Sequence, residues 1–111
     1  MLTPSEGISE MAVVHPDAKI GEGVTISPFT TIAADVEIGP GTWIGPNVSI
    51  GVGTVLDSHV VIKKNTQMGK DNRISAFASL GGDSQSRFDH PDQETYLEIG
   101  DRNVIHEYVS I

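Results

Sequence analysis

Residues 36–56 read VEIGPGTWIGPNVSIGVGTVL, and this stretch decides the fold. A large aliphatic residue recurs in it at every sixth position. The same step reaches twelve such residues in succession, and three more follow after a gap. These positions are Val14, Ile20, Ile26, Ile32, Ile38, Ile44, Ile50, Leu56, Ile62, Met68, Ile74 and Leu80, then Ile99, Ile105 and Ile111. Because 38% of the residues are hydrophobic, the probability that twelve successive positions of one register are all hydrophobic by chance is about 10⁻⁵.

Two further columns follow the same six-residue period. Glycine follows the aliphatic residue at seven positions, and the residue two before it is mostly small or β-branched. Because side chains alternate along a strand, these two residues point to the same side. Each hexad is therefore expected to be a short strand with one small and one large inward residue. The glycine is expected to relieve the backbone where the chain turns.

Other secondary structures fit this period poorly. Six residues advance a helix by about 600°, so successive aliphatic residues would lie on different helix faces. An antiparallel sandwich would need hairpin turns, and the sequence has no Asn-Gly or Asp-Gly pair. The hexads resemble the repeat of left-handed parallel β-helix proteins, which implies an all-β triangular prism of three sheets. We expect about five coils in a single domain, residues 1–111, with coils at 12–81 and 97–111.

Composition excludes several function classes. The 111 residues carry a formal net charge of −8, which argues against binding to nucleic acid or to an anionic membrane surface. There is no cysteine, hence no disulfide or thiolate metal site. Neither a signal peptide nor a membrane-spanning stretch is apparent. A soluble cytoplasmic protein without membrane insertion is expected.

Residues 82–96 interrupt the period and are expected to form a loop outside the prism that carries function. The four histidines, His15, His59, His90 and His106, are interpreted as solvated or structural, because no acid partner or cleft is evident for them. Asn72 and Asn103 replace the small inward residue. If the loop adds thirteen residues, they stack on adjacent coils, where amides can form a ladder.

Local strings give a more specific resemblance. The sequence is similar to the UDP-N-acetylglucosamine acyltransferases of lipid A biosynthesis, a hexapeptide-repeat family. The similar strings are residues 14–18 (VHPDA), 58–62 (SHVVI), 72–74 (NRI), 77–81 (FASLG), 97–103 (LEIGDRN) and 105–111 (IHEYVSI).

This resemblance implies transfer of an (R)-3-hydroxyacyl chain from acyl carrier protein to the 3-hydroxyl of UDP-N-acetylglucosamine, the first step of lipid A biosynthesis. It implies a homotrimer, a histidine base, and no cofactor or metal. Gln85 matches a substrate-binding position of the family loop, and Arg87 approximates its basic position. Ser86 stands where the family has Asp.

The family's catalytic histidine, further coils and helical C-terminal domain match no part of these residues. The chain is thus expected to correspond to the N-terminal part of the enzyme, to contain no catalytic residue, and to be inactive alone. Two alternatives stay open. One is a non-catalytic β-helix scaffold or assembly module. The other is a zinc enzyme like the γ-class carbonic anhydrases, which needs two closely spaced histidines that this sequence lacks.

Overall fold

In this computed structural model, fourteen short strands form within the described residues, 7–81 and 97–106, and each ends on a predicted aliphatic position. The strands are β1 (Val13–Val14), β2 (Lys19–Ile20), β3 (Thr25–Ile26), β4 (Thr31–Ile32), β5 (Glu37–Ile38), β6 (Trp43–Ile44), β7 (Ser49–Ile50), β8 (Val55–Leu56), β9 (Val61–Ile62), β10 (Thr66–Met68), β11 (Arg73–Ile74), β12 (Ser79–Leu80), β13 (Leu97–Ile99) and β14 (Val104–Ile105).

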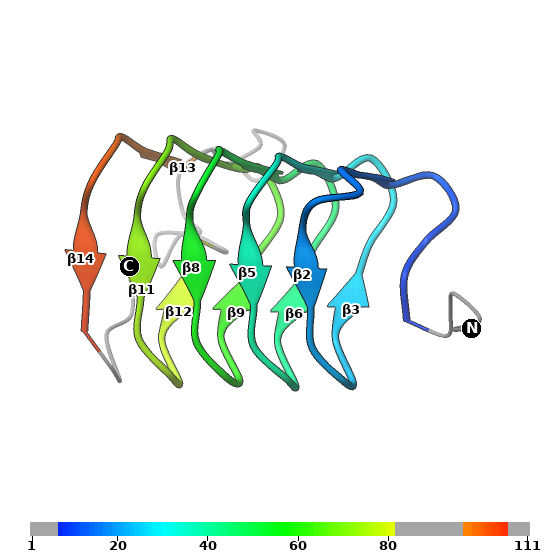
Figure 1. Cartoon of the computed structure of the whole chain (residues 1–111), viewed down its shortest axis with the longest axis horizontal. Helices are drawn as coiled ribbons and strands as arrows, with labels where there is room; N and C mark the ends of the chain where they lie inside the picture. Colours follow the sequence, from blue (N-terminus) through cyan, green and yellow to red (C-terminus); the bar gives the residue numbers. More distant parts are fainter. Residues whose placement is uncertain (1–6, 82–96, 107–111) are drawn as a thin grey trace, which may run out of the picture.

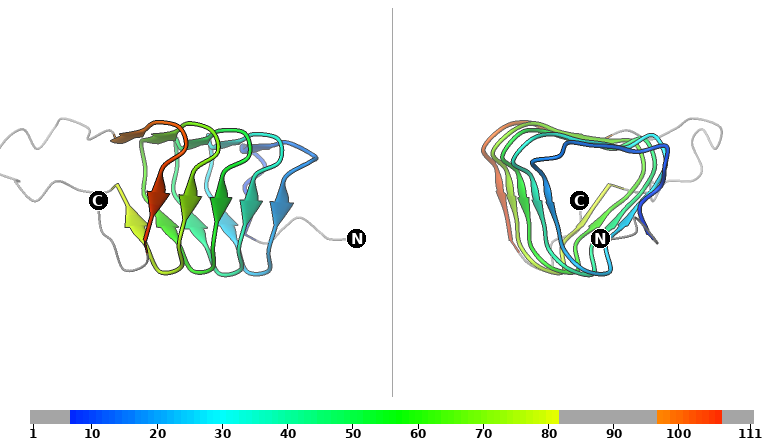
Figure 2. Two further views of the ribbon diagram at one scale, coloured as in Figure 1. Left: turned by 60° about the vertical axis from the view of Figure 1, so that its left-hand side comes forward. Right: turned by 45° about the vertical axis from the view of Figure 1, so that its right-hand side comes forward.

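The strands belong to three parallel sheets that the chain visits in rotation (Figure 1). Sheet A has the order β12-β9-β6-β3, sheet B β1-β4-β7-β10-β13, and sheet C β14-β11-β8-β5-β2. The winding has a triangular outline (Figure 2). The predicted left-handed parallel β-helix is confirmed, and the described strands make four turns and part of a fifth. The register also extends one hexad earlier than expected, since Ile8 bridges Ile26 in parallel.

The core consists of the two inward columns that the sequence predicted. Ile44, Ile50, Leu56 and Ile62 are each at most 1% exposed. The threonines of the small column are buried as well, and their hydroxyls find partners in the backbone. Thr54 Oγ1, for example, donates to the Gly69 carbonyl at 3.0 Å. Such pairing removes the penalty of burying a hydroxyl, so Thr and Val can share this column.

The prediction that glycine follows the aliphatic residue because the chain turns there is wrong. Among these glycines only Gly81 has a positive φ. A Cβ on Gly51 would instead lie 2.5 Å from the Gly69 carbonyl oxygen of the next coil, whereas one on Gly100, in the last described turn, would have nothing within 4 Å. The column is therefore glycine because neighbouring coils approach too closely there for a side chain.

The turn falls two residues later, at the third residue after each aliphatic from Ile20 to Ile74 and after Ile99. This corner position has a left-handed backbone conformation, with φ between 55° and 64° in the non-glycine residues. Its occupants are Phe29, Asp35, Asn47, His59, Asn65, Asp71, Phe77 and Arg102, together with Gly23, Gly41 and Gly53. Asn and Asp tolerate this conformation, but phenylalanine rarely adopts it.

Asn72 and Asn103 occupy one column on adjacent turns, as predicted. Thr66 pairs with Leu97, so this turn takes 31 residues instead of the usual 18, and the count of thirteen extra residues is confirmed. The Asn72 amide, however, bonds to backbone. Its Nδ2 donates to the Gly69 and Gly100 carbonyls at 3.0 and 2.8 Å, and its Oδ1 accepts from the Asn103 N–H at 2.8 Å. The described residues contain no helix that could cross a bilayer.

Candidate functional site

The two predicted substrate contacts, Gln85 and Arg87, lie outside the described residues, as does His90. The structure does place both ends of their segment. Gly81 follows β12 in sheet A, and Leu97 begins β13 in sheet B, where its N–H donates to the Asn65 carbonyl at 3.0 Å. The segment 82–96 therefore departs and returns where the chain passes from sheet A to sheet B, which we call the A–B edge.

The A–B edge contains the amide ladder that was expected elsewhere. Asn47 Nδ2 donates to Asn65 Oδ1 of the adjacent coil at 2.7 Å, and the Asn65 residue is only 4% exposed. The physical reasoning about stacked amides was right, but it was applied to Asn72 and Asn103. The spacing of 18 between Asn47 and Asn65 was a signal that could have identified this ladder. Lys63 and Lys64 lie exposed beside it.

The three described histidines are all exposed. His15 Nδ1 accepts a hydrogen bond from the Asp17 N–H at 3.0 Å, and the Asp17 carboxylate is 3.9 Å from the same nitrogen. A catalytic His–Asp pair needs that nitrogen to donate its proton to the carboxylate. Because Nδ1 accepts instead, this pair is not arranged as such a dyad.

His59 occupies a corner position between sheets C and A. Its imidazole stacks on Phe77 with ring centroids 5.4 Å apart and planes 9° apart. The ring also covers Gly41, since a Cβ there would lie 2.6 Å from His59 Nε2. His59 is thus packed against two neighbouring coils, which favours the structural role expected for it.

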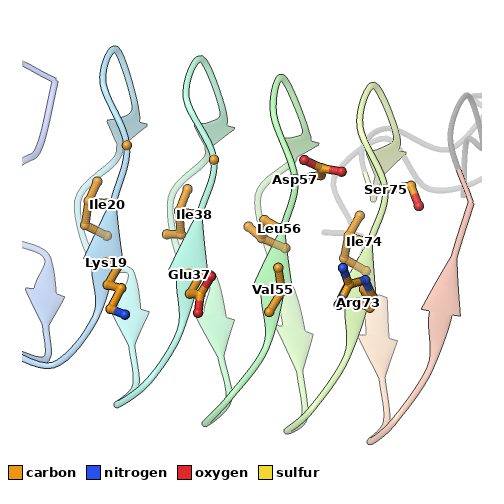
Figure 3. Close-up of a pocket in the computed structure, with 12 residues that line it drawn as sticks. Lys19, Ile20, Glu37, Ile38, Val55, Leu56, Asp57, Arg73, Ile74 and Ser75 are labelled. Carbon is orange, nitrogen blue, oxygen red and sulfur yellow. The ribbon is translucent and has the colours of Figure 1, made fainter.

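A depression of about 350 Å³ lies on the outer face of sheet C (Figure 3). One row of outward residues on this face consists of Lys19, Glu37, Val55 and Arg73, which pair in register. Charges of both signs therefore lie along it, in the order cation, anion, apolar and cation. Such a face could take a zwitterionic or extended polar ligand. It holds no paired nucleophile and base.

Sequence reasoning missed a second row on sheet C. Asp57, Ser75 and His106 each directly follow an inward residue on the adjacent strands β8, β11 and β14. In catalytic triads the histidine stands between the acid and the nucleophile. Here the serine stands between the other two, and Asp57 Oδ1 accepts from the Ser58 N–H. This row therefore lacks the order that would activate Ser75.

Within residues 7–81 and 97–106, no three His, Asp or Glu side chains converge so that they could hold a metal ion. The zinc-enzyme alternative thus has no ligand set in the described part of the chain.

Comparison with known proteins bears on the family. No family model matches the chain. The acyl-[acyl-carrier-protein]–UDP-N-acetylglucosamine O-acyltransferase of Psychrobacter sp. is 49% identical over 49 residues, 44% of this chain and 18% of that protein. The Psychromonas ingrahamii enzyme of the same name is 48% identical over 50 residues, 45% of this chain and 19% of its own. This chain is related to the UDP-N-acetylglucosamine O-acyltransferases. The resemblance seen in the sequence is confirmed.

Solved structures agree with this relationship to the O-acyltransferases. The Francisella novicida UDP-N-acetylglucosamine acyltransferase aligns with 94% of this chain and 42% of its own, at 26% identity and a TM-score of 0.53. A GDP-perosamine N-acetyltransferase from Caulobacter crescentus aligns with 89% of this chain at 18% identity and a TM-score of 0.51, which shows the shared fold alone. The matched stretches span less than a fifth of the curated relatives named above.

Proposed function

We propose that this chain forms part of an O-acyltransferase that acts on UDP-N-acetylglucosamine in lipid A biosynthesis. The observation that carries the proposal is the identity of almost one half over 49 residues with an enzyme of that name. The donor would be an (R)-3-hydroxyacyl thioester of acyl carrier protein. The sugar 3-hydroxyl attacks the thioester carbonyl, an ester forms, and the carrier's thiol leaves with a proton.

The proposed roles of the chain are to hold the substrate and to assemble. Gln85 and Arg87 contact the sugar nucleotide from the segment anchored at the A–B edge. The enzyme works as a cytoplasmic homotrimer and needs neither cofactor nor metal. This reaction requires only a base for the hydroxyl proton and hydrogen-bond donors for the developing oxyanion.

Residues 1–111 alone are proposed to be inactive. A general base must lie within hydrogen-bond reach of the hydroxyl and is usually oriented by an acid. His15 Nδ1 accepts from backbone, and His59 is stacked on Phe77. His106 lies on the open face of sheet C in the row with Ser75. The resemblance to the acyltransferases implies that the base comes from residues outside these 111.

One titration, applied to the wild type and to four variants, tests the binding role. Isothermal titration of the 111-residue chain with UDP-N-acetylglucosamine should give millimolar binding that falls at least fivefold in Gln85→Ala and in Arg87→Gln. The matched controls are Gln67→Ala, on the exposed face of sheet B, and Arg73→Gln, in the sheet C depression. Loss of binding in Arg73→Gln but not in Arg87→Gln would move the site to sheet C. Absence of binding in the wild type would contradict the proposal.

A single assay tests the inactivity. The chain is mixed with UDP-N-acetylglucosamine and (R)-3-hydroxyacyl-acyl carrier protein, and release of the carrier's thiol is followed. We expect no release above the rate without protein. Turnover would refute the claim that the base lies elsewhere.

The second candidate function is a non-catalytic β-helix scaffold. The observation that favours it is that none of the described histidines is arranged as a base with an acid behind it. A chain that assembles but binds neither the sugar nucleotide nor acyl carrier protein would support this alternative over the enzyme.

A further inference from the structure

Exposed apolar side chains gather at the A–B edge of the first turns. Seven large hydrophobic residues of the described chain are exposed, and four of them lie here: Met11, Val13, Phe29 and Trp43, exposed by 59, 65, 65 and 40%. Met11 and Phe29 lie on adjacent coils, since the Phe29 N–H donates to the Met11 carbonyl. We call these four residues the apolar edge.

Trp43 leans toward this edge from the outer face of sheet A. A Cβ on Gly45 would lie 3.2 Å from two atoms of the indole benzo ring, so the ring lies along its own strand over Gly45. Gly45 and Pro46 lead from Trp43 into the edge. The indole therefore extends the apolar surface sideways from the corner onto the sheet.

The A–B edge carries less charge than the edge between sheets B and C or the outer face of sheet C. Its corner row, Met11, Phe29, Asn47 and Asn65, has no charged residue, and charges flank it only at the ends, at Glu10 and at Lys63 and Lys64. The corner row between sheets C and A, which is Gly23, Gly41, His59 and Phe77, likewise has no Asp, Glu, Lys or Arg, but it lacks a comparable cluster of exposed apolar side chains. The row at the edge between sheets B and C contains Asp17, Asp35, Asp71 and Arg102, and sheet C presents Lys19, Glu37, Asp57 and Arg73. With a net charge of −8, two copies repel each other least where this charge is absent.

An edge that runs along the prism also suits contact between identical copies. If copies are related by rotation about an axis parallel to the edge, each residue of the row meets the same residue of its neighbours. Apolar residues tolerate such self-contact, and asparagine amides both donate and accept. A row of aspartates would place like charges against one another.

The backbone at Phe29 gives an independent reason to look for a partner there. Phe29 and Phe77 have φ of 64° and 63°, a conformation that bulky residues rarely adopt. Phe77 stacks on His59 within the chain, whereas Phe29 stays 65% exposed. Asparagine or aspartate would suit this corner better, so an aromatic ring there is explained if a neighbouring copy covers it.

We propose that the A–B edge is the surface through which copies of this chain assemble about a rotation axis, with Phe29 packed against Phe29 and Asn47 against Asn47. The inference rests on the homotrimer of the proposed function and assigns its contact surface. The apolar edge supplies the buried centre, and the exposed side chain of Asn47 continues the contact along the axis.

Sedimentation velocity at micromolar concentration tests the edge with a matched pair of variants. Wild type and Phe77→Asp should sediment as oligomers, and Phe29→Asp as a monomer near 11.8 kDa. Aspartate already occupies the same corner position at Asp35 and Asp71, with φ of 59° and 58°, so Phe29→Asp keeps a native backbone. A monomeric wild type, or equal masses for the two variants, would overturn the proposal.

A crosslink identifies the surface directly, because the chain has no cysteine. Phe29→Cys should form disulfide-linked pairs under mild oxidation, and Phe77→Cys should not. Equal crosslinking of Phe29→Cys and Phe77→Cys, or no crosslinking of Phe29→Cys, would contradict the proposed contact between copies at Phe29. Neither experiment uses substrate. If the chain crosslinks at position 29 but does not bind the sugar nucleotide, only the enzymatic proposal is refuted. If it binds the sugar nucleotide but does not crosslink at position 29, only the assembly through the A–B edge is refuted.

Discussion

Replacing Gly51 with alanine tests why coils can stack at this spacing. The new Cβ would lie 2.5 and 2.6 Å from the carbonyl oxygen and carbon of Gly69, where ordinary contact begins near 3.4 Å. These atoms are backbone and cannot rotate away. The coils would have to separate, yet the Gly51 N–H already donates to the Met68 carbonyl at 2.9 Å in the ladder between them. Overpacking of this kind costs about 1–3 kcal/mol, and more where nothing can yield.

The matched control is Gly100→Ala, in the same column of the repeat. Within the part of the chain that the structure describes, its Cβ would have nothing within 4 Å, and its φ is outside the left-handed region. Alanine there restricts the unfolded chain and should be neutral or stabilising by about 0.4–1 kcal/mol. Urea unfolding followed by circular dichroism measures both free energies. If Gly51→Ala and Gly100→Ala shift the midpoint equally, the column is glycine for some reason other than coil contact.

Two further substitutions test the core and the interrupted turn. Ile50→Asp, at a position only 1% exposed, should lower the free energy of unfolding by several kcal/mol because it buries an unpaired charge. Ser49→Asp, on the exposed side of the same strand, should change it by less than about 0.5 kcal/mol in the same urea titration. Asn72→Ala removes the partner of three backbone groups. It should speed hydrogen exchange at Asn103 at least tenfold, whereas Asn47→Ala should leave that exchange rate unchanged.

The fold could be predicted from the sequence because the column of large aliphatic residues alone indicates a β-helix. Every sixth residue had to be large and aliphatic to fill the prism, and a period of six fits no helix. Even the length of the inserted segment could be counted, because the register resumes at Ile99. The resemblance of the family strings also proved sound, since it depends on the order of several short motifs along the chain.

The left-handed corner position could not be found in this way. Its occupants range from Gly to Phe, Asp, His and Arg, so no side-chain property marks the column. What they share is a backbone angle, which only the structure displays. The glycine column misled for the complementary reason. Its conspicuous residue suggested a turn, but the constraint is the distance to the next coil, and distances between coils are absent from a sequence pattern.

The candidate site was harder to predict than the fold because it lies where the repeat is broken. Gln85 and Arg87 were selected only by resemblance, since the hexad period stops at Leu80 and gives no register for them. The anchors of that segment, Gly81 and Leu97, were predictable from the count, and they bring it to the A–B edge. The segment that carries the proposed substrate contacts thus begins and ends at the same edge as the proposed assembly surface.

Bulky residues at the left-handed corner position indicate where the repeat serves a purpose other than folding. A left-handed residue with a side chain costs about 1–2 kcal/mol relative to glycine, and asparagine and aspartate partly offset it through local hydrogen bonds. Phe29 and Phe77 have no such local compensation. At Phe77 the stack on His59, which itself lies over Gly41, recovers energy within the chain. At Phe29 the ring stays exposed beside Met11, so folding alone gives little reason to keep an aromatic residue there. Contact with a second copy supplies that reason, on an edge whose corner row is uncharged from Met11 to Asn65.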